Sequence, residues 1–390
     1  MSKRYYFDHA ATTPLDPEVF QAMEPFLKDK FGNPSSIYQE GQEAERAITE
    51  ARERVQELIN AADSREIIFT GSGTEADNLA IKGIAMALKE EGNHIITSET
   101  EHHAVLHTCE FLEKHYDFEV SYLSVDSEGF IDLADLREEI KDDTILITIM
   151  TANNEIGTIQ PIEEIAEIAA ENNVYFHTDA VQAAGQLDID VQKSKVDLLS
   201  ISAHKINGPK GVGALYVKKG TKLLPQMQGG AQERKRRAST ENVPGIVGFG
   251  KAAQLAKKRL PEKQSKMIKL RDKIINRVLE EIDEVRLNGP RQEHRLPNNA
   301  SFCFRYIEGE SILLNLDMLG IAASSGSACT SGSLDPSHVM LALGLSHEVA
   351  HGSLRISLGY RTTEEEVDYL LEKLPPVIQK LRDMSPLYEG

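Results

Sequence analysis

A lysine and an aspartate each follow a short apolar run in this sequence. Lys205 comes just after the run at 196–200, so its amine is expected at the end of a buried strand. Asp179 ends another apolar run, upstream at 174–179. A lysine amine at such a place can form a Schiff base, and a carboxylate can face the ring nitrogen of pyridoxal phosphate. The pair therefore predicts a cofactor enzyme.

A glycine-rich segment at 71–76, with the sequence GSGTEA, follows one predicted strand and opens a predicted helix. It matches the dinucleotide-binding pattern G-x-G-x-x-G/A, and Glu99 stands near the expected position of a ribose-binding acid. The same backbone amides bind any phosphate, including that of pyridoxal phosphate. Ser72 and Glu75 also fit a simple capping box. On its own the segment leaves these three interpretations open.

Polar residues follow other predicted strands as well. His102 comes after the second strand, where it could stack on an aromatic cofactor, and Asn154 comes after the most apolar strand. Gln182 lies three residues beyond Asp179. The carboxyl ends of parallel strands meet at one edge of a sheet, which favours a ligand over loop bracing. Because the adjacent His102 and His103 point in different directions, we expect no shared metal.

A cysteine and an arginine near the C-terminus complete the candidates. Cys329 stands in a run of small residues at 323–333, where we expect an exposed thiol with a chemical role. Cys109 and Cys303 lie in patterns typical of packing. Arg355, between two apolar strand residues, could bind a substrate carboxylate. A salt-bridged arginine at a sheet edge fits that segment equally well.

The elements that must position these residues alternate between short apolar runs and helical patterns. This alternation predicts an α/β fold with a mostly parallel sheet. The predicted strands are Ile67–Phe69, His94–Ile96, Ile145–Ile149, Val174–Phe176, Leu198–Leu199 and Gly213–Val217. The predicted helices are Thr74–Glu90, Pro161–Glu171 and a helix after Tyr38 with one apolar stripe.

The pattern changes after Gly245, which indicates a second, smaller domain. A long charged helical region runs to Glu281, and strands at 298–305 and 354–358 precede an amphipathic helix at 363–384. We therefore predict a large α/β domain at 16–260. A small α+β domain, formed by 1–15 and 261–390, would carry Cys329.

Composition narrows the function classes. The 390 residues suit two domains, and a net charge of −18 argues against broad nucleic-acid binding. The N-terminus shows no apolar targeting segment and no run is long enough to span a membrane, so we expect a cytoplasmic protein. Three cysteines predict neither a disulfide framework nor a metal site. The basic run at 234–237 suits either an anion site or a solvated loop.

Eight motifs in order strongly resemble cysteine desulfurases of the NifS/IscS type. They are FDHAATTP at 7–14, FGNPSS at 31–36, GTE at 73–75, EH at 101–102, NNEIG at 153–157, TDAVQ at 178–182, SAHK at 202–205 and SACT at 327–330. The resemblance implies a pyridoxal-phosphate enzyme of fold type I, in the class V aminotransferase family. It also implies removal of sulfur from L-cysteine, giving L-alanine and a persulfide on Cys329.

The resemblance assigns roles on the cofactor side of the site. Lys205 would form the Schiff base, Asp179 would contact the pyridine nitrogen, and Gln182 would contact the ring hydroxyl. His102 would stack on the ring and act in proton transfer. The phosphate would be held by Gly73, Thr74, Ser202 and His204, with Thr240 reaching the phosphate of a neighbouring subunit.

On the substrate side, Asn154, also near the cofactor, and Arg355 would hold the cysteine carboxylate, with Asn33 beside them. Family members are homodimers that pass sulfur to acceptors such as a cluster scaffold or a tRNA-thiolation enzyme. The alternatives are a selenocysteine lyase, another fold type I enzyme such as an aminotransferase and, remotely, an NAD-dependent oxidoreductase.

The loop at 229–240 departs from the family pattern. The family commonly has Gly-Gly-Gly-x-Glu-Arg and then Arg-Ser-Gly-Thr, but this chain has Ala231 in the first motif and Ala238-Ser239 in the second. The loss of two glycines restricts the backbone if either position needs a positive φ. The assignment of Thr240 depends on this loop.

Overall fold

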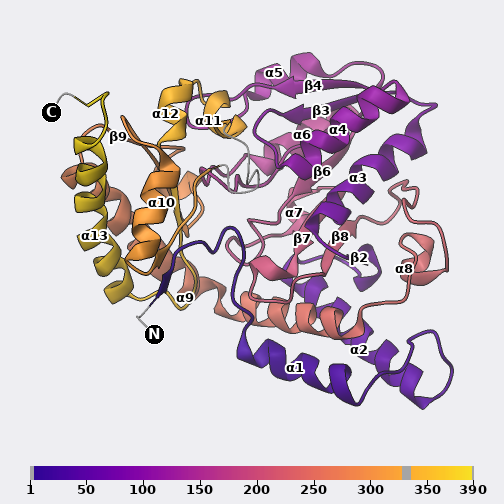
Figure 1. Cartoon of the computed structure of the whole chain (residues 1–390). Helices are drawn as coiled ribbons and strands as arrows, with labels where there is room; N and C mark the ends of the chain where they lie inside the picture. Colours follow the sequence, from indigo (N-terminus) through magenta and orange to yellow (C-terminus); the bar gives the residue numbers. More distant parts are fainter. Residues whose placement is uncertain (1–3, 327–334, 389–390) are drawn as a thin grey trace.

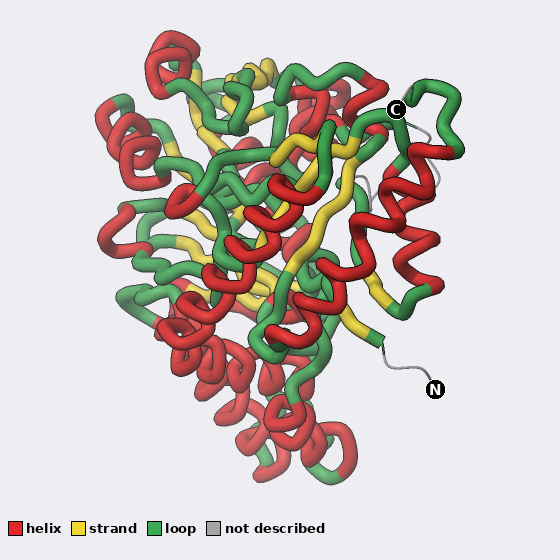
Figure 2. The backbone as a smooth tube through the Cα atoms, turned by 90° about the vertical axis from the view of Figure 1, so that its left-hand side faces the viewer, coloured by secondary structure: helices red, strands yellow, loops and turns green. Residues whose placement is uncertain are grey.

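A computed structural model describes residues 4–326 and 335–388 of the chain. Figure 1 shows the elements around the larger sheet on one side and most of the C-terminal elements on the other. Figure 2, turned by 90°, shows strands inside the molecule and helices mostly at its periphery. Within the described residues, no helix is both long and apolar enough to cross a membrane.

The larger sheet has seven strands, and β8 is antiparallel to both of its neighbours while the other pairs are parallel. In spatial order the strands are β2 (Ile67–Thr70), β8 (Gly213–Val217), β7 (Leu198–Ser202), β6 (Tyr175–Asp179), β5 (Thr144–Thr148), β3 (His94–Ser98) and β4 (Glu119–Leu123). All strands but β4 are almost entirely buried, as continuous apolar runs in a parallel sheet predict.

Helices lie around this sheet, and most of them contribute residues to two hydrophobic clusters. They are α1 (Pro17–Lys28), α2 (Gln39–Leu58), α3 (Gly73–Leu88), α4 (His103–Tyr116), α5 (Leu133–Glu139), α6 (Ile162–Glu171) and the short α7 (Val191–Ser194) and α8 (Gln232–Lys235). The predicted stripe after Tyr38 is the buried face of α2, with Ile48 and Val55 almost fully covered. Its covered apolar area stabilises the contact between α2 and the rest of the core.

The smaller part contains a three-stranded antiparallel sheet in the order β12 (Ser353–Ser357), β10 (Asn299–Phe304) and β9 (Val285–Leu287). The two-residue strands β1 (Tyr5–Tyr6) and β11 (Ile321–Ala322) pair in parallel beside it. The helices are α10 (Gly309–Met318), α11 (His338–Ala342), α12 (His347–His351) and α13 (Glu364–Asp383). Thr363 begins α13 with the capping box that its Thr-x-x-Glu sequence specifies.

The helix α9 (Val243–Glu281) connects the two parts. Its residues up to Ala256 belong to the core around the large sheet, and those from Met267 belong to the core of the small sheet. The predicted boundary at 260 lies between them, inside the helix, and remains a prediction. The predicted fold class is confirmed, although β1, β4, β9 and β11 were missed.

Candidate active site

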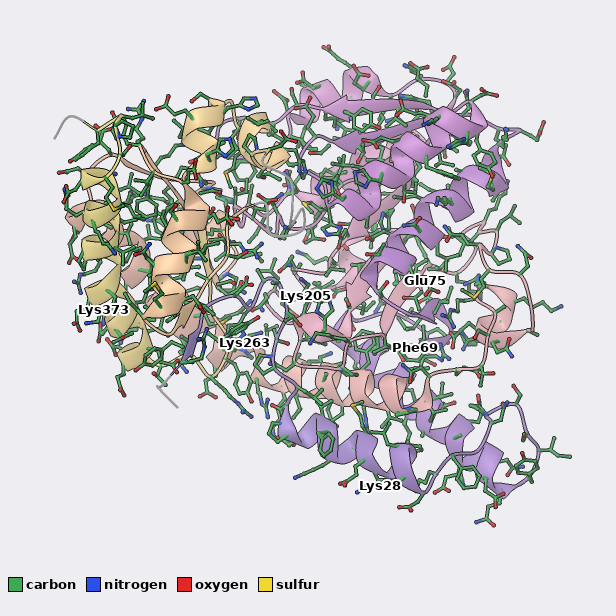
Figure 3. The ribbon with its side chains drawn as sticks, viewed as in Figure 1. Lys28, Phe69, Glu75, Lys205, Lys263 and Lys373 are labelled. Carbon is green, nitrogen blue, oxygen red and sulfur yellow. The ribbon has the colours of Figure 1, made fainter. Side chains whose placement is uncertain are left out.

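A cavity of about 270 Å³ lies at the carboxyl edge of the large sheet. Figure 3 shows Lys205 in the middle of the molecule, between the elements of the two sheets. The lining residues come from the N-terminal segment, from the ends of β5, β6 and β7, from the start of α3 and from β12. They are Ala10, Ala11, Ser72, Gly73, Thr74, Asp77, His102, Met150, Ala152, Asn154, Asp179, Val181, Gln182, Ser202, His204, Lys205 and Arg355.

Lys205 enters the cavity from a single turn that follows β7. Its amine donates hydrogen bonds to the carbonyl oxygens of Ala10 and Ala11, the second at 2.9 Å. The side-chain amide of Gln182 also donates to the oxygen of Ala10, at 2.9 Å. The N-terminal segment therefore forms one wall of the site through its backbone. The side chains of Ala10 and Ala11 do not indicate that their backbone oxygens accept hydrogen bonds from Lys205.

Asp179 is the last residue of β6, as its position after an apolar run predicted. Its Oδ1 accepts a hydrogen bond from the amide of Val181 at 2.8 Å, which fixes the carboxyl group at the strand end. Burial raises the pKa of Asp179 to about 6, while the Val181 amide and the charge of Lys205 oppose this effect. A cationic group bound beside it would favour its ionised form.

Asp77 is a site residue that the sequence analysis missed. It lies on α3, lines the cavity and is almost fully buried, and its Oδ1 has no hydrogen-bond partner among the described residues. Burial and the neighbouring Asp179 raise the pKa of Asp77 well above the usual range. A carboxyl residue within the otherwise apolar buried stripe of α3 was the signal that could have identified it.

His102 begins α4 as its N-cap residue and lines the cavity. Its Nδ1 accepts a hydrogen bond from the amide of Ala104 at 3.1 Å, so the proton of the neutral ring is on Nε2. Burial and the nearby charge of Lys205 lower the pKa of His102 to about 4. The ring is therefore neutral at physiological pH.

One group of residues that line the cavity suits a phosphate. Gly73 and Thr74 begin α3, where backbone N–H groups have no partner within the helix. A side chain at Gly73 would approach Val181 to 2.8 Å, so the backbone there is open to a ligand only because the residue is glycine. The buried hydroxyl of Ser202 has no hydrogen-bond partner among the described residues. These groups, with His204, fit the phosphate of pyridoxal phosphate.

Arg355 reaches the cavity from β12. Its Nη1 donates to the backbone oxygen of Asn154, and its Nη2 forms an ion pair with Asp8, both at 3.0 Å. The buried Nε has no partner among the described residues. The ion pair with Asp8 fits the salt-bridged alternative, and binding of a substrate carboxylate by Arg355 remains a prediction.

Two predicted site residues that the structure describes lie away from the cavity. Asn33 and Thr240 are exposed and do not line the cavity of this single chain. Cys329 lies outside the described residues. Cys109 and Cys303 are buried, as packing residues should be.

The backbone angles of the loop at 229–240 show which of its two missing glycines matters for conformation. Ala231 has φ −89°, which any residue adopts, whereas Ser239 has φ +97°, in the region that favours glycine. Only the second replacement strains the backbone. The loop is held by Glu233, which pairs with Arg52, and by Arg237, whose Nε donates to Glu75 at 2.7 Å.

The dinucleotide interpretation of residues 71–76 is wrong. The pattern requires β2 to lie among parallel neighbours, but among the described strands β2 pairs with the antiparallel β8 alone. Glu99 follows β3, and the strands β8, β7, β6 and β5 lie between it and β2. Ser72 caps α3 by accepting from the Glu75 amide at 3.1 Å, but Glu75 accepts from Gly71 rather than completing a capping box.

Known proteins share this fold and sequence. The family described as Aminotransferase class-V matches residues 5–370. A protein named cysteine desulfurase IscS, from Clostridium botulinum strain Hall, is 57% identical over 390 residues, which cover 100% of this chain and 98% of the relative. A solved structure titled NifS-like protein has a TM-score of 0.91 at 39% identity, covering 97% of this chain and 100% of its own. A structure titled SspA in complex with cysteine has a TM-score of 0.81 at 39% identity, covering 93% and 100%.

The chain therefore belongs to the class-V aminotransferase family, and the predicted pyridoxal-phosphate cofactor is confirmed with it. Within that family its full-length similarity is to cysteine desulfurases of the NifS/IscS type, as the eight motifs predicted. The alternatives of a selenocysteine lyase, an aminotransferase and an NAD-dependent oxidoreductase are not favoured.

Proposed function

We propose that this chain removes sulfur from L-cysteine, producing L-alanine and a persulfide on Cys329. The observation that carries the proposal is the convergence of Lys205, Asp179 and Arg355 on one cavity, in a chain 57% identical to a cysteine desulfurase. Pyridoxal phosphate, when bound, withdraws electrons from the α-carbon of an attached amino acid. The residues around it supply orientation and proton transfer.

The proposed binding roles follow the chemistry of the cavity. Asp179 would face the pyridine nitrogen, and its carboxylate form would keep that nitrogen protonated. Gln182 would contact the ring hydroxyl. Gly73, Thr74, Ser202 and His204 would hold the phosphate. Asn154 and Arg355, which both line the cavity, would orient the substrate carboxylate, for which a guanidinium is a charged hydrogen-bond donor.

The proposed proton transfers involve two residues. The Lys205 amine, which already lies within hydrogen-bonding distance of two cavity-wall carbonyls, would move the proton of the substrate α-carbon. His102, whose ring is neutral with its proton on Nε2, is the second residue, either to deprotonate the incoming thiol or to protonate the product. The Cys329 thiolate would attack the substrate sulfur and form the sulfur–sulfur bond as the substrate carbon–sulfur bond breaks. The electron pair of the broken bond would stay on the three-carbon unit, and protonation of that unit would complete L-alanine.

We also propose that the active form is a homodimer. Asn33 lies between Phe31 and Ile37, whose side chains are 83% and 89% exposed. Large apolar side chains so fully exposed are typical of surfaces that a partner covers. A second chain on this surface would bring Asn33 near its cavity, and a similar approach would let Thr240 reach the neighbouring phosphate.

The destination of the sulfur is part of the proposal. Iron-sulfur cluster assembly, through a scaffold protein, is favoured by the similarity to proteins named IscS, and a tRNA-thiolation enzyme is the second acceptor. Reduced thiols such as the buried Cys109 and Cys303 suit the cytoplasm. Pull-down of proteins that take up labelled persulfide sulfur would separate the two acceptors.

The test of the proposed activity uses the Cys329→Ala variant with bound cofactor. We expect it to keep the visible absorption band of the cofactor and to form no persulfide with L-cysteine, as read by mass spectrometry. Normal production of sulfide and L-alanine by this variant would refute the role of Cys329. Parallel turnover of L-selenocysteine would show whether the thiol is needed only for sulfur.

A further inference from the structure

The turn at 153–157, which follows β5 and contributes Asn154 to the cavity wall, contains a buried carboxyl group that the proposed chemistry does not use. Glu155 is only 6% exposed. Its backbone is fixed on both sides: its amide donates to Asn153 Oδ1 at 2.8 Å, and its carbonyl accepts from Asn299 at 3.1 Å. A rigid backbone therefore presents this side chain in one direction.

The carboxyl group contacts two residues that are distant from it in sequence. The hydroxyl of Ser337 donates to Glu155 Oε2 at 2.5 Å. Gly326 packs against the same oxygen so closely that an added Cβ would lie 2.5 Å from it. Gly326 and Ser337 flank residues 327–334, and Cys329 is the third residue after Gly326.

Ser337 and Gly326 are each hydrogen-bonded to a helix or strand. Ser337 also accepts from the amide of Val339 at 3.1 Å and so begins α11, which Figure 1 shows beside the elements of the large sheet. The amide of Gly326 donates to the hydroxyl of Ser353, at the start of β12. Glu155 Oε2, on the turn at 153–157, thus contacts Gly326, which is bonded to β12, and Ser337, which begins α11. These two residues lie on either side of residues 327–334 in the sequence.

We propose that Glu155 is a positioning residue for the thiol of Cys329, acting by holding Gly326 and Ser337 against the turn that lines the cavity. This inference rests on the proposed function. A chain segment whose two ends are fixed at one point keeps its reactive group at a high effective concentration near that point. Release of either end would lower the rate of sulfur transfer without removing any contact to the substrate.

The charge of Glu155 gives this arrangement a pH dependence. Burial raises the pKa of Glu155 to about 7, while the Ser337 hydroxyl and the charge of Arg355 oppose the rise. Arg355 is itself paired with Asp8, and the charge of Glu155 also acts on Cys303, whose burial raises its pKa to about 11 and keeps it neutral. As pH rises through about 7, the carboxylate forms and accepts a stronger hydrogen bond from Ser337.

The experiment compares Glu155→Gln, Ser337→Ala and the exposed control Glu164→Gln with the wild type, all as holoenzyme. Single-turnover formation of the Cys329 persulfide is followed by mass spectrometry. Binding of L-cysteine is followed by the change in the visible band, and thermal unfolding reports folding. At pH 8 we expect both site variants to form the persulfide about 5–10-fold more slowly, with binding within twofold of wild type. The ratio of wild-type to Glu155→Gln rates should approach one below pH 6.

Two results would overturn the inference. One is an unchanged rate of persulfide formation in Glu155→Gln and Ser337→Ala, together with a wild type that does form the persulfide. The other is an equal loss of binding and rate, or a rate ratio independent of pH, which would assign Glu155 a purely structural role. Failure of the wild type to form any persulfide would instead refute the proposed function.

Discussion

The ion pair between Arg52 and Glu233 predicts a large effect of a single substitution on stability. It joins α2 to the loop that precedes Thr240, and its side chains are 10% and 3% exposed. Glu233 accepts two hydrogen bonds from the Arg52 guanidinium, at 2.6 and 2.8 Å, and one from the amide of Phe69 at 3.0 Å. Glu233→Ala would leave a buried cation and a buried amide without their acceptor.

The expected loss of unfolding free energy in Glu233→Ala depends on the interactions that Arg52 keeps. Removal of one partner from a buried pair costs about 3–5 kcal/mol, because the other charge stays buried. Arg52 keeps a hydrogen bond to Ile67 and its position 4.7 Å from the Phe69 ring, which favours the lower end of that range. With an unfolding entropy of about 2.1 cal/mol/K per residue over 390 residues, the melting temperature should fall by about 4 °C.

The assay is urea unfolding and thermal unfolding of the apo chain, with Glu24→Ala as the control. Glu24 pairs with Lys28 on the surface of α1, and its loss should cost at most about 0.5 kcal/mol. The reasoning would be refuted if Glu233→Ala and Glu24→Ala had equal effects. A double variant with apolar residues at 52 and 233 should recover much of the loss, since no charge is then left unpaired.

Three further predictions concern residues around the site. Ser239→Gly should raise the free energy of unfolding by about 1 kcal/mol, because it relieves a φ of +97°; a lower melting temperature would contradict this. Asp179→Asn should stabilise the apo chain by about 3 kcal/mol at pH 8. Burial raises the pKa of Asp179 in the folded chain to about 6, so the wild type loses stability as pH rises from about 4 to 6. The stabilisation of the variant relative to wild type should therefore vanish near pH 4. A stabilisation that does not change with pH in a urea-unfolding series would contradict this prediction. Arg355→Gln should lower kcat/KM for L-cysteine about 100-fold through loss of a charged hydrogen-bond donor; equal steady-state kinetics would remove Arg355 from substrate binding.

The sequence predicted much of the fold and of the candidate site because the buried strands of the large sheet are continuous apolar runs. Six such runs correspond to strands of the large sheet, and polar residues at their ends, such as Asp179 and Lys205, line the cavity. The exposed and partly polar β4 was missed because periodicity does not separate it from a loop. The two-residue strands β1 and β11 depend on tertiary pairing and leave no local pattern.

Other parts of the site could not be predicted because they depend on contacts across the chain. The carbonyl oxygens of Ala10 and Ala11 accept from Lys205, about 195 residues away, and no side chain marks them. Likewise, Glu155 belonged to a recognised motif, but its contacts with Gly326 and Ser337 follow only from the packing of the two parts of the molecule. Local patterns specify elements, and tertiary packing decides which residues meet.

The most direct test of the account concerns the amine of Lys205. The holoenzyme is reduced with borohydride, digested with trypsin and analysed by mass spectrometry. The account predicts reduced cofactor on Lys205, with loss of cleavage after that residue, and no trapped adduct in Lys205→Ala. Reduced cofactor on the neighbouring Lys210 would contradict the assignment on which the whole site depends.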